Sequence, residues 1–275
     1  MSDNRPIGIF DSGVGGLSVW REIAAHLPHE DTLYFADQIH IPYGPRSLAQ
    51  IRSFSEAITG YLIDRGCKLI VVACNAASAA ALKHLRATFP ETPFVGMEPA
   101  VKPAAEQTHT GVVGVLATPA TFQGELFASV VERFANGVRL VKEICPGLVQ
   151  QVEAGRLDTP DTLAMLDRFL KPIRDANADK IVLACTHYPF VIDSIRSLAP
   201  GIDVIDPAPA IARQVNRVLC ERGLAATSER IGQHRFITSG DRARFRSTVA
   251  ALVQIEPSTE LAVWNAERLS TVSLS

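Results

Sequence analysis

The sequence lacks the features that mark membrane-spanning, exported and nucleic-acid-binding proteins. Its 27 basic and 29 acidic side chains leave a formal charge of −2, so there is no basic surplus for a nucleic acid or an anionic membrane. The longest nearly apolar run, residues 69–82, is shorter than the roughly 20 residues that cross a bilayer. The first residues show no apolar stretch behind a basic one, so no secretory signal is predicted. We therefore expect a cytoplasmic protein with no membrane or nucleic-acid partner.

Closely spaced cysteine pairs are missing as well. The five cysteines are odd in number and form no Cys-x-x-Cys pair. Without an export signal, we expect free thiols rather than disulfides. A zinc site is not expected either, because Cys185 and His187 have no second close Cys/His pair to complete a ligand set. Each cysteine therefore needs its own explanation.

Short apolar runs alternate with amphipathic helical patterns along most of the chain. Strands are predicted at two series of runs: "PIGIF", "TLYFA", "KLIVVAC" and "TPFVGM", then "GVVGVLA", "VRLVKEIC", "DKIVLAC" and "IDVIDP". Continuous apolar strands between amphipathic helices are typical of parallel sheets covered on both faces. The predicted fold class is α/β, with two pseudo-symmetric domains that each hold a mainly parallel sheet flanked by helices.

The two series resemble each other as a diverged internal repeat. "IVVAC" and "IVLAC" are apolar strands that end in Cys74 and Cys185, and the first strand of each series ends a similar distance before its cysteine. We predict one domain from residues 1–98 plus 208–275 and another from residues 99–207. The site is expected in the cleft between them, since open α/β sheets bind ligands at the carboxyl ends of their strands.

Cys74 and Cys185 are expected to lie between the end of a strand and the start of a helix. A thiol there is close to the positive end of the helix dipole, which lowers its pKa from about 8.5 towards neutrality. Asn75 and Thr186 are the predicted helix caps. A lone cysteine in this position is more often structural, but two at matching positions favour chemistry. The remaining cysteines are predicted to be packing residues: Cys67, Cys145 and Cys220.

Two thiols that face a shared cleft suit the inversion of a carbon centre. One group removes a proton from one face while the other returns a proton to the opposite face, and the roles exchange with the direction of reaction. Nearby carboxylates and a histidine would set which thiol is charged. The carbanion needs fixed dipoles around its carboxylate and amine, for which the candidates are Ser12, Tyr43, Gly44, Asn75 and Thr186.

The glycine-rich turn in "FDSGVGGLSV" matches neither common phosphate motif. Ser18 replaces the third glycine of the dinucleotide fingerprint, and no Gly-Lys pair is present. Backbone N–H groups at such a turn suit a carboxylate as well as a phosphate. A purely structural turn is equally compatible with the glycines, whereas Asp11 and Ser12 at the strand tip favour a functional one.

Five stretches together resemble the glutamate racemases: "FDSGVGGLSV", "IPYGPRS", "ACNAASA", "CPGLVQQVEAG" and "ACTHYPF". These are cofactor-independent enzymes that interconvert L- and D-glutamate and supply D-glutamate for peptidoglycan. The resemblance implies proton donor and acceptor roles for Cys74 and Cys185, with Asp11 beside the first and Glu153 and His187 supporting the second. It implies substrate contacts from Asp11, Ser12, Tyr43, Gly44, Asn75, Ala76, Thr186 and His187. It implies no metal or cofactor, and because family members are often dimers it leaves a homodimer open.

Two positions depart from the family's pattern. Ala76 stands where threonine is usual, so a hydroxyl that would hold the substrate carboxylate is missing, at a cost of about 1.5–3 kcal/mol. Gln38 stands where threonine is common, and the sequence offers no consequence for it. Two other interpretations stay open: a related racemase, such as one for aspartate, and a non-catalytic two-lobed amino-acid-binding protein, which would leave the paired cysteines unexplained.

Overall fold

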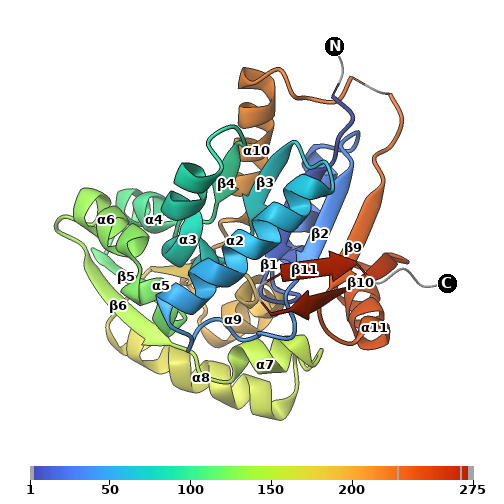
Figure 1. The fold of residues 1–275 in the computed structure, drawn as a ribbon. Coiled ribbons are helices and arrows are strands. Elements are labelled where there is room, and N and C mark those ends of the chain that lie inside the picture. Colours follow the sequence, from blue (N-terminus) through green and yellow to red (C-terminus); the bar gives the residue numbers. More distant parts are fainter. Residues whose placement is uncertain (1–2, 228, 267, 272–275) are drawn as a thin grey trace.

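A computed structural model describes residues 3–227, 229–266 and 268–271 of the chain (Figure 1). Its strands form one sheet of seven strands, in the order β11-β10-β9-β2-β1-β3-β4, and one of four, in the order β6-β5-β7-β8. Among the described strands, every neighbouring pair except the β10–β11 hairpin is parallel. The predicted α/β class with mainly parallel sheets is confirmed.

The larger sheet has the fully buried strand β1 in its interior. Its strands are β1 (Ile7–Asp11), β2 (Thr32–Ala36), β3 (Leu69–Val72), β4 (Phe94–Gly96), β9 (His234–Thr238), β10 (Ser258–Asn265) and β11 (Arg268–Thr271). Side chains of β1 alternate between faces: Ile9 packs among residues of α1 (Leu17–His26), α10 (Ala208–Glu221) and α11 (Arg242–Val253). Phe10 packs on the other face, among residues of α2 (Leu48–Asp64) and α3 (Asn75–Thr88).

The smaller sheet is also covered on both faces. Its strands are β5 (Val112–Ala117), β6 (Arg139–Ile144), β7 (Lys180–Ala184) and β8 (Asp203–Ile205). One face packs against α4 (Val101–Gln107) and α6 (Glu125–Phe134). The other packs against α7 (Leu148–Glu153), α8 (Pro160–Asp175), the 3₁₀ helix Tyr188–Val191 and α9 (Ile192–Leu198). The short helix α5 (Pro119–Gln123) follows β5.

The division of strands between the sheets supports a two-domain organisation. Strands β1–β4 and β9–β11 belong to the larger sheet, and β5–β8 belong to the smaller one. We propose that the domains are residues 1–98 plus 208–275 and residues 99–207. Parts of these ranges, at residues 1–2, 228, 267 and 272–275, lie outside the described residues.

The C-terminal segment extends the larger sheet, and the sequence patterns predicted its strand at 234–238 but not β10 and β11. Strand β9 pairs with β2, and β10 then adds beside β9 before β11 turns back as a hairpin. Ala262 is the one residue of β10 described as buried, so the strand lacks the strong apolar alternation by which strands are recognised. The indole N–H of Trp264 donates to Asp37 at 2.8 Å and ties this hairpin to the loop after β2.

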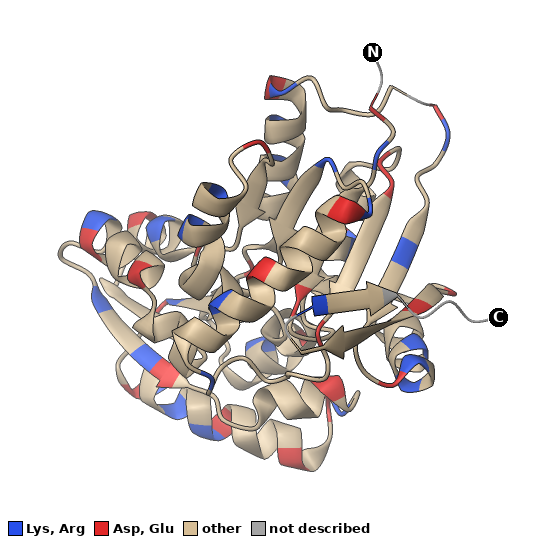
Figure 2. Cartoon of the chain, viewed as in Figure 1, with Lys and Arg blue, Asp and Glu red and all other residues tan. Residues whose placement is uncertain are grey.

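The charged residues show no segregation by sign along the ribbon in Figure 2. Acidic and basic residues interleave over the outer helices there, in keeping with the near-zero net charge. Within the described ranges, no helix combines the length and apolarity needed to cross a membrane.

Candidate active site

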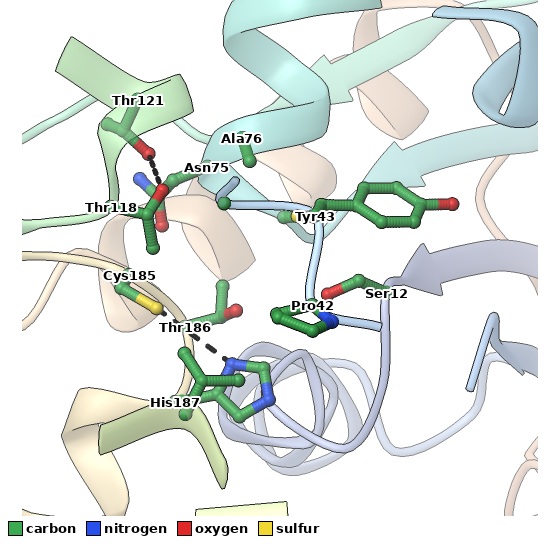
Figure 3. A pocket seen from close by; sticks show the side chains of 13 residues that line it. Ser12, Pro42, Tyr43, Asn75, Ala76, Thr118, Thr121, Cys185, Thr186 and His187 are labelled. Atoms are coloured by element: carbon green, nitrogen blue, oxygen red, sulfur yellow. Dashed lines mark hydrogen bonds between the residues drawn. The ribbon is translucent and has the colours of Figure 1, made fainter. Parts of the chain in front are cut away.

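The carboxyl ends of strands from both sheets border one small pocket (Figure 3). Its lining comes from the segments that follow β1, β2, β3, β5, β6 and β7: Ser12, Pro42, Tyr43, Gly44, Cys74, Asn75, Ala76, Thr118, Thr121, Val149, Cys185, Thr186 and His187. The pocket volume is about 20 Å³, which is room for about one water molecule. A substrate of amino-acid size can therefore enter only when the lining segments move apart.

The predicted site residues converge on this pocket in two layers. Most of the predicted substrate contacts line it directly, together with both candidate thiols. Asp11 lies close enough to Cys74 to influence its pKa, and it accepts a hydrogen bond from the Thr186 hydroxyl at 3.4 Å. Glu153 lies behind His187, at 2.7 Å from its Nε2 atom. Each thiol therefore has a carboxylate on its own side of the pocket.

Cys74 is itself the N-cap of α3. Its backbone is extended, and its Sγ accepts a hydrogen bond from the Ala77 N–H at 3.4 Å. The predicted capping role of Asn75 is therefore wrong, because Asn75 is already the first residue of the helix. On the other side, Thr186 caps no helix: the 3₁₀ helix begins after His187, which makes no side-chain cap hydrogen bond.

The electrostatic surroundings of Cys74 favour the neutral thiol. Burial raises the pKa of Cys74 well above its usual value, and the nearby Asp11 carboxylate raises it further, against the hydrogen bond from Ala77. The expected lowering of the Cys74 pKa by the helix terminus is therefore wrong, because desolvation and a like charge outweigh the dipole. Burial likewise raises the pKa of Asp11, opposed by His187 and by the hydrogen bonds that Asp11 receives.

Cys185 contacts His187, which in turn contacts Glu153, and these contacts favour a positively charged His187 ring beside a negatively charged Glu153. Its Sγ lies 3.9 Å from Nδ1 of His187, whose Nε2 faces Oε1 of Glu153 at 2.7 Å. Burial opposes an imidazolium here, but hydrogen bonds with Cys185 and Glu153 outweigh it and raise the pKa of His187 well above its ordinary value. Burial also opposes the Glu153 carboxylate, yet contacts with His187 and the Val14 N–H keep the pKa of Glu153 low.

The glycine-rich turn binds two carboxylates of the chain itself. The N–H groups of Gly13 and Gly16 donate to Asp11 Oδ2 at 3.1 and 3.2 Å, and the Val14 N–H donates to Glu153 Oε1 at 2.7 Å. A Cβ atom at Gly13 would collide with the Glu153 carboxylate, and one at Gly15 would collide with the His187 ring. The glycines are thus required by the close approach of Glu153 and His187.

Asn75 presents an unpaired amide group to the pocket. The residue is only 3% exposed, and within the described part of the chain neither its Oδ1 nor its Nδ2 atom has a hydrogen-bond partner. A buried amide without partners costs about 1–3 kcal/mol, and such groups in native structures call for an explanation. A polar ligand in the pocket would supply the missing partners.

Thr118 and Thr121 are site residues that the sequence analysis did not single out. Both line the pocket, and their hydroxyl oxygens lie 3.0 Å apart (Figure 3). Thr118 comes directly after β5, the first strand of the second series. Ser12 holds the equivalent place after β1, the first strand of the first series. The internal repeat that pairs Cys74 with Cys185 therefore contained the signal for Thr118.

Tyr43 borders the pocket without directing its hydroxyl into it. Figure 3 shows its ring pointing away from Cys185, and the hydroxyl donates to the buried Asp37 at 2.6 Å. Asp37 also accepts hydrogen bonds from Ser239 and Trp264. The phenol therefore anchors the loop.

The remaining cysteines differ in their surroundings. Cys67 and Cys145 are buried, as expected for packing residues, whereas Cys220 is exposed on α10, so its predicted packing role is wrong. Burial raises the pKa of Cys67 to about 12, which keeps that thiol neutral. Among the described residues, no cluster of three or more His, Cys, Asp or Glu side chains is arranged to hold a metal ion.

Comparison with known proteins gives a consistent family assignment. The Asp/Glu/hydantoin racemase model matches residues 8–215, and a glutamate racemase from Roseiflexus sp. is 51% identical over 92% of this chain and 94% of the relative. A solved glutamate racemase from Bacillus anthracis has a TM-score of 0.88 at 29% identity, covering 97% of this chain and 99% of that one. One from Francisella tularensis, in complex with D-glutamate, has a TM-score of 0.84 at 30% identity, covering 96% and 98%. The chain belongs to the Asp/Glu/hydantoin racemase family, and within it to the glutamate racemases.

Proposed function

We propose that the chain interconverts L- and D-glutamate by a cofactor-independent mechanism with Cys74 and Cys185 as the two proton-transfer groups. The observation that carries the proposal is that both thiols line the same small pocket, from equivalent strand ends of the two sheets. Glutamate as the substrate is supported by the relatives, one of which was solved with D-glutamate.

The two halves of the pocket suit opposite protonation states. The imidazolium of His187 stabilises a thiolate at Cys185, while burial and Asp11 keep Cys74 as a thiol. Cys185 then removes the Cα proton from one face of glutamate, and Cys74 donates its own proton to the opposite face. The product leaves Cys185 as a thiol and Cys74 as a thiolate, which is the state that catalyses the reverse reaction. Asp11 is the group placed to relay the proton at Cys74.

The polar groups around the pocket would hold the substrate during proton transfer. We assign contacts with its carboxylates and amine to Ser12, Asn75, Thr186, His187, Asp11 and the backbone at Tyr43 and Gly44, as the family resemblance implies. Thr118 and Thr121 add two hydroxyls to the same pocket. Fixed dipoles of this kind stabilise charge that develops at the reacting carbon without reorganising during the reaction.

Replacing Asn75 by alanine should raise KM for glutamate about 5- to 150-fold, the equivalent of about 1–3 kcal/mol. The melting temperature of the free protein should not fall, because the buried amide has no partner to lose among the described residues. Steady-state kinetics and thermal melts measure the two effects. The exposed Asn136 serves as the control through Asn136→Ala. An unchanged KM would contradict the substrate contact, and a large drop in stability would indicate a structural role instead.

Restoring a hydroxyl at position 76 should strengthen substrate binding. Ala76 lines the pocket, and Ala76→Thr should lower KM for glutamate about 10-fold or more, from about 1.5–3 kcal/mol for a hydrogen bond to a charged group. Ala87→Thr, at an exposed position of the same helix, is the matched control. Equal KM values for the variant and the original protein would mean that the missing hydroxyl has no consequence.

The experiment that tests the proposed function is a chirality assay on glutamate and aspartate in parallel. Purified protein without added pyridoxal phosphate should convert L-glutamate to the racemic mixture and act poorly on aspartate. Preference for aspartate would favour the related racemase. Binding of glutamate without inversion would favour the non-catalytic amino-acid-binding protein.

The cellular role follows from the product. We propose that the D-glutamate formed serves peptidoglycan synthesis in the cytoplasm, as the family resemblance implies. A homodimer stays a prediction, and sedimentation analysis of the purified protein tests it.

A further inference from the structure

Gln38 connects the C-terminal part of the larger sheet to the Cys185 side of the pocket. Its side chain begins just after β2, and its Nε2 donates to Glu153 Oε2 at 3.1 Å. Its Oε1 accepts a hydrogen bond from the Thr238 hydroxyl, at the end of β9, at 2.9 Å. Thr238 is fully buried, and its hydroxyl oxygen accepts the Gly240 N–H at 3.0 Å. The amide is therefore oriented from one end by β9 and directed at Glu153 from the other.

The hydrogen bond from Gln38 completes the coordination of the Glu153 carboxylate. His187 and the Val14 N–H both address Oε1, and in the part of the chain that the structure describes, Gln38 is the residue that donates to Oε2. Without this donor the carboxylate could rotate away from the ring of His187. The donation also helps to keep the pKa of Glu153 low.

We propose that Gln38 is a positioning residue that orients Glu153, and through it His187 and Cys185, so that β9 takes part in setting the geometry of one proton-transfer group. This inference rests on the proposed racemase function. Gln38 does not line the pocket, so it acts on proton transfer and not on substrate binding. A glutamine is suited to the task because a neutral donor leaves the negative charge on Glu153.

Titratable groups from the Cys74 side of the pocket also contribute to the electrostatic environment of Glu153 and His187. Other titratable groups that face Glu153 or His187, or act on them through Asp11, are Tyr34, Cys74, Cys185 and Asp11 itself. All of them are unchanged in a variant at position 38, so differences between variants report on that position.

Two substitutions separate a positioning role from a merely structural one. Gln38→Leu removes the donor and should lower kcat about 10-fold or more at every pH, as expected when a catalytic group is displaced, with KM for glutamate unchanged. Gln38→Glu places a second carboxyl group beside Glu153, and repulsion between two anions at this separation raises the pKa of the introduced group. Below that pKa its O–H can donate to Glu153 as the amide does; above it, two anions repel.

The experiment compares kcat and KM across pH for the original protein, Gln38→Leu, Gln38→Glu and the exposed control Gln107→Leu. We expect Gln38→Glu to match the original protein at low pH and to lose kcat as the pH rises, a transition absent from the other proteins. Nitrogen NMR of the His187 ring, assigned with His187→Asn, is recorded in parallel. In Gln38→Glu its titration should move to higher pH, because an added anion stabilises the imidazolium.

The outcomes distinguish this inference from the function on which it rests. If the original protein does not racemise glutamate, the proposed function fails, and the His187 titration alone decides whether Gln38 acts on the ring. If the original protein is active while Gln38→Leu keeps its kcat and Gln38→Glu keeps the original pH profile, the positioning role is overturned. A rise in KM with kcat unchanged would also overturn it.

Discussion

Replacing either Cys74 or Cys185 by alanine is expected to lower racemisation of glutamate by about 10³-fold or more. A positioned acid or base contributes about 10²–10⁴-fold to proton transfer, and each thiol is assigned to a different face of the substrate. Melting temperatures should change little by comparison with the activity, and they serve as the check on folding. The exposed Cys220 provides the control, since Cys220→Ala should keep the original rate.

The single-thiol variants should retain one half of the reaction. In D₂O, the remaining thiolate can still exchange the Cα hydrogen of the enantiomer that faces it, without inversion. Cys74→Ala and Cys185→Ala should therefore exchange opposite enantiomers. Exchange of both enantiomers by one variant would contradict the assignment of one thiol to each face, and so would racemisation that persists in both variants.

Replacing Glu153 by glutamine is expected to lower kcat about 10²-fold, within the range of acid–base contributions. The isosteric amide fills the same space but carries no charge to stabilise the imidazolium of His187. The pKa of His187 is raised well above its ordinary value in the original protein, so the loss of Glu153 should lower it. Because the imidazolium exists below this pKa, the alkaline limb of the pH–rate profile should move to lower pH. His187→Asn should show a similar loss of kcat without that limb.

A second histidine–carboxylate pair in the chain offers a matched control. Nε2 of His84 lies 2.6 Å from Oε2 of Glu56 on the outer surface of α2 and α3, which is similar to the distance between His187 and Glu153. Glu56→Gln should leave kcat and the pH profile unchanged. If both substitutions had the same effect on the profile, the charge of Glu153 would have no specific role at the thiol.

The parts of the fold and of the site that depend on local sequence patterns could be predicted. Apolar runs between amphipathic helices determined the α/β class, because a strand buried on both faces of a parallel sheet needs continuous apolar residues. The repeat of a strand ending in Cys74 and in Cys185 predicted that both thiols would lie near one cleft, and both line the pocket. The motifs that resemble the family added Glu153, whose place in α7 carries no local signal of function.

Features that depend on tertiary contacts could not be predicted. The pKa of Cys74 depends on burial and on Asp11, which comes from a different strand, so the helix dipole was a misleading guide. The orientation of the Gln38 side chain depends on a hydrogen bond from Thr238, which lies two hundred residues further along the chain. The last two strands of the chain, β10 and β11, are held by pairing with β9 and with each other, and the mixed burial of β10 hides the alternation that marks a strand.

The central claim is that two opposed thiols, one on each face of glutamate, carry out the inversion. It is tested most directly by incubating the protein with L-glutamate in D₂O, without pyridoxal phosphate, and analysing both enantiomers at early times. We predict that the D-glutamate formed carries deuterium at Cα while the remaining L-glutamate keeps its hydrogen, because the group that donates is not the one that removed the proton. Deuterium entering L-glutamate as fast as D-glutamate, or D-glutamate formed without deuterium, would contradict the account.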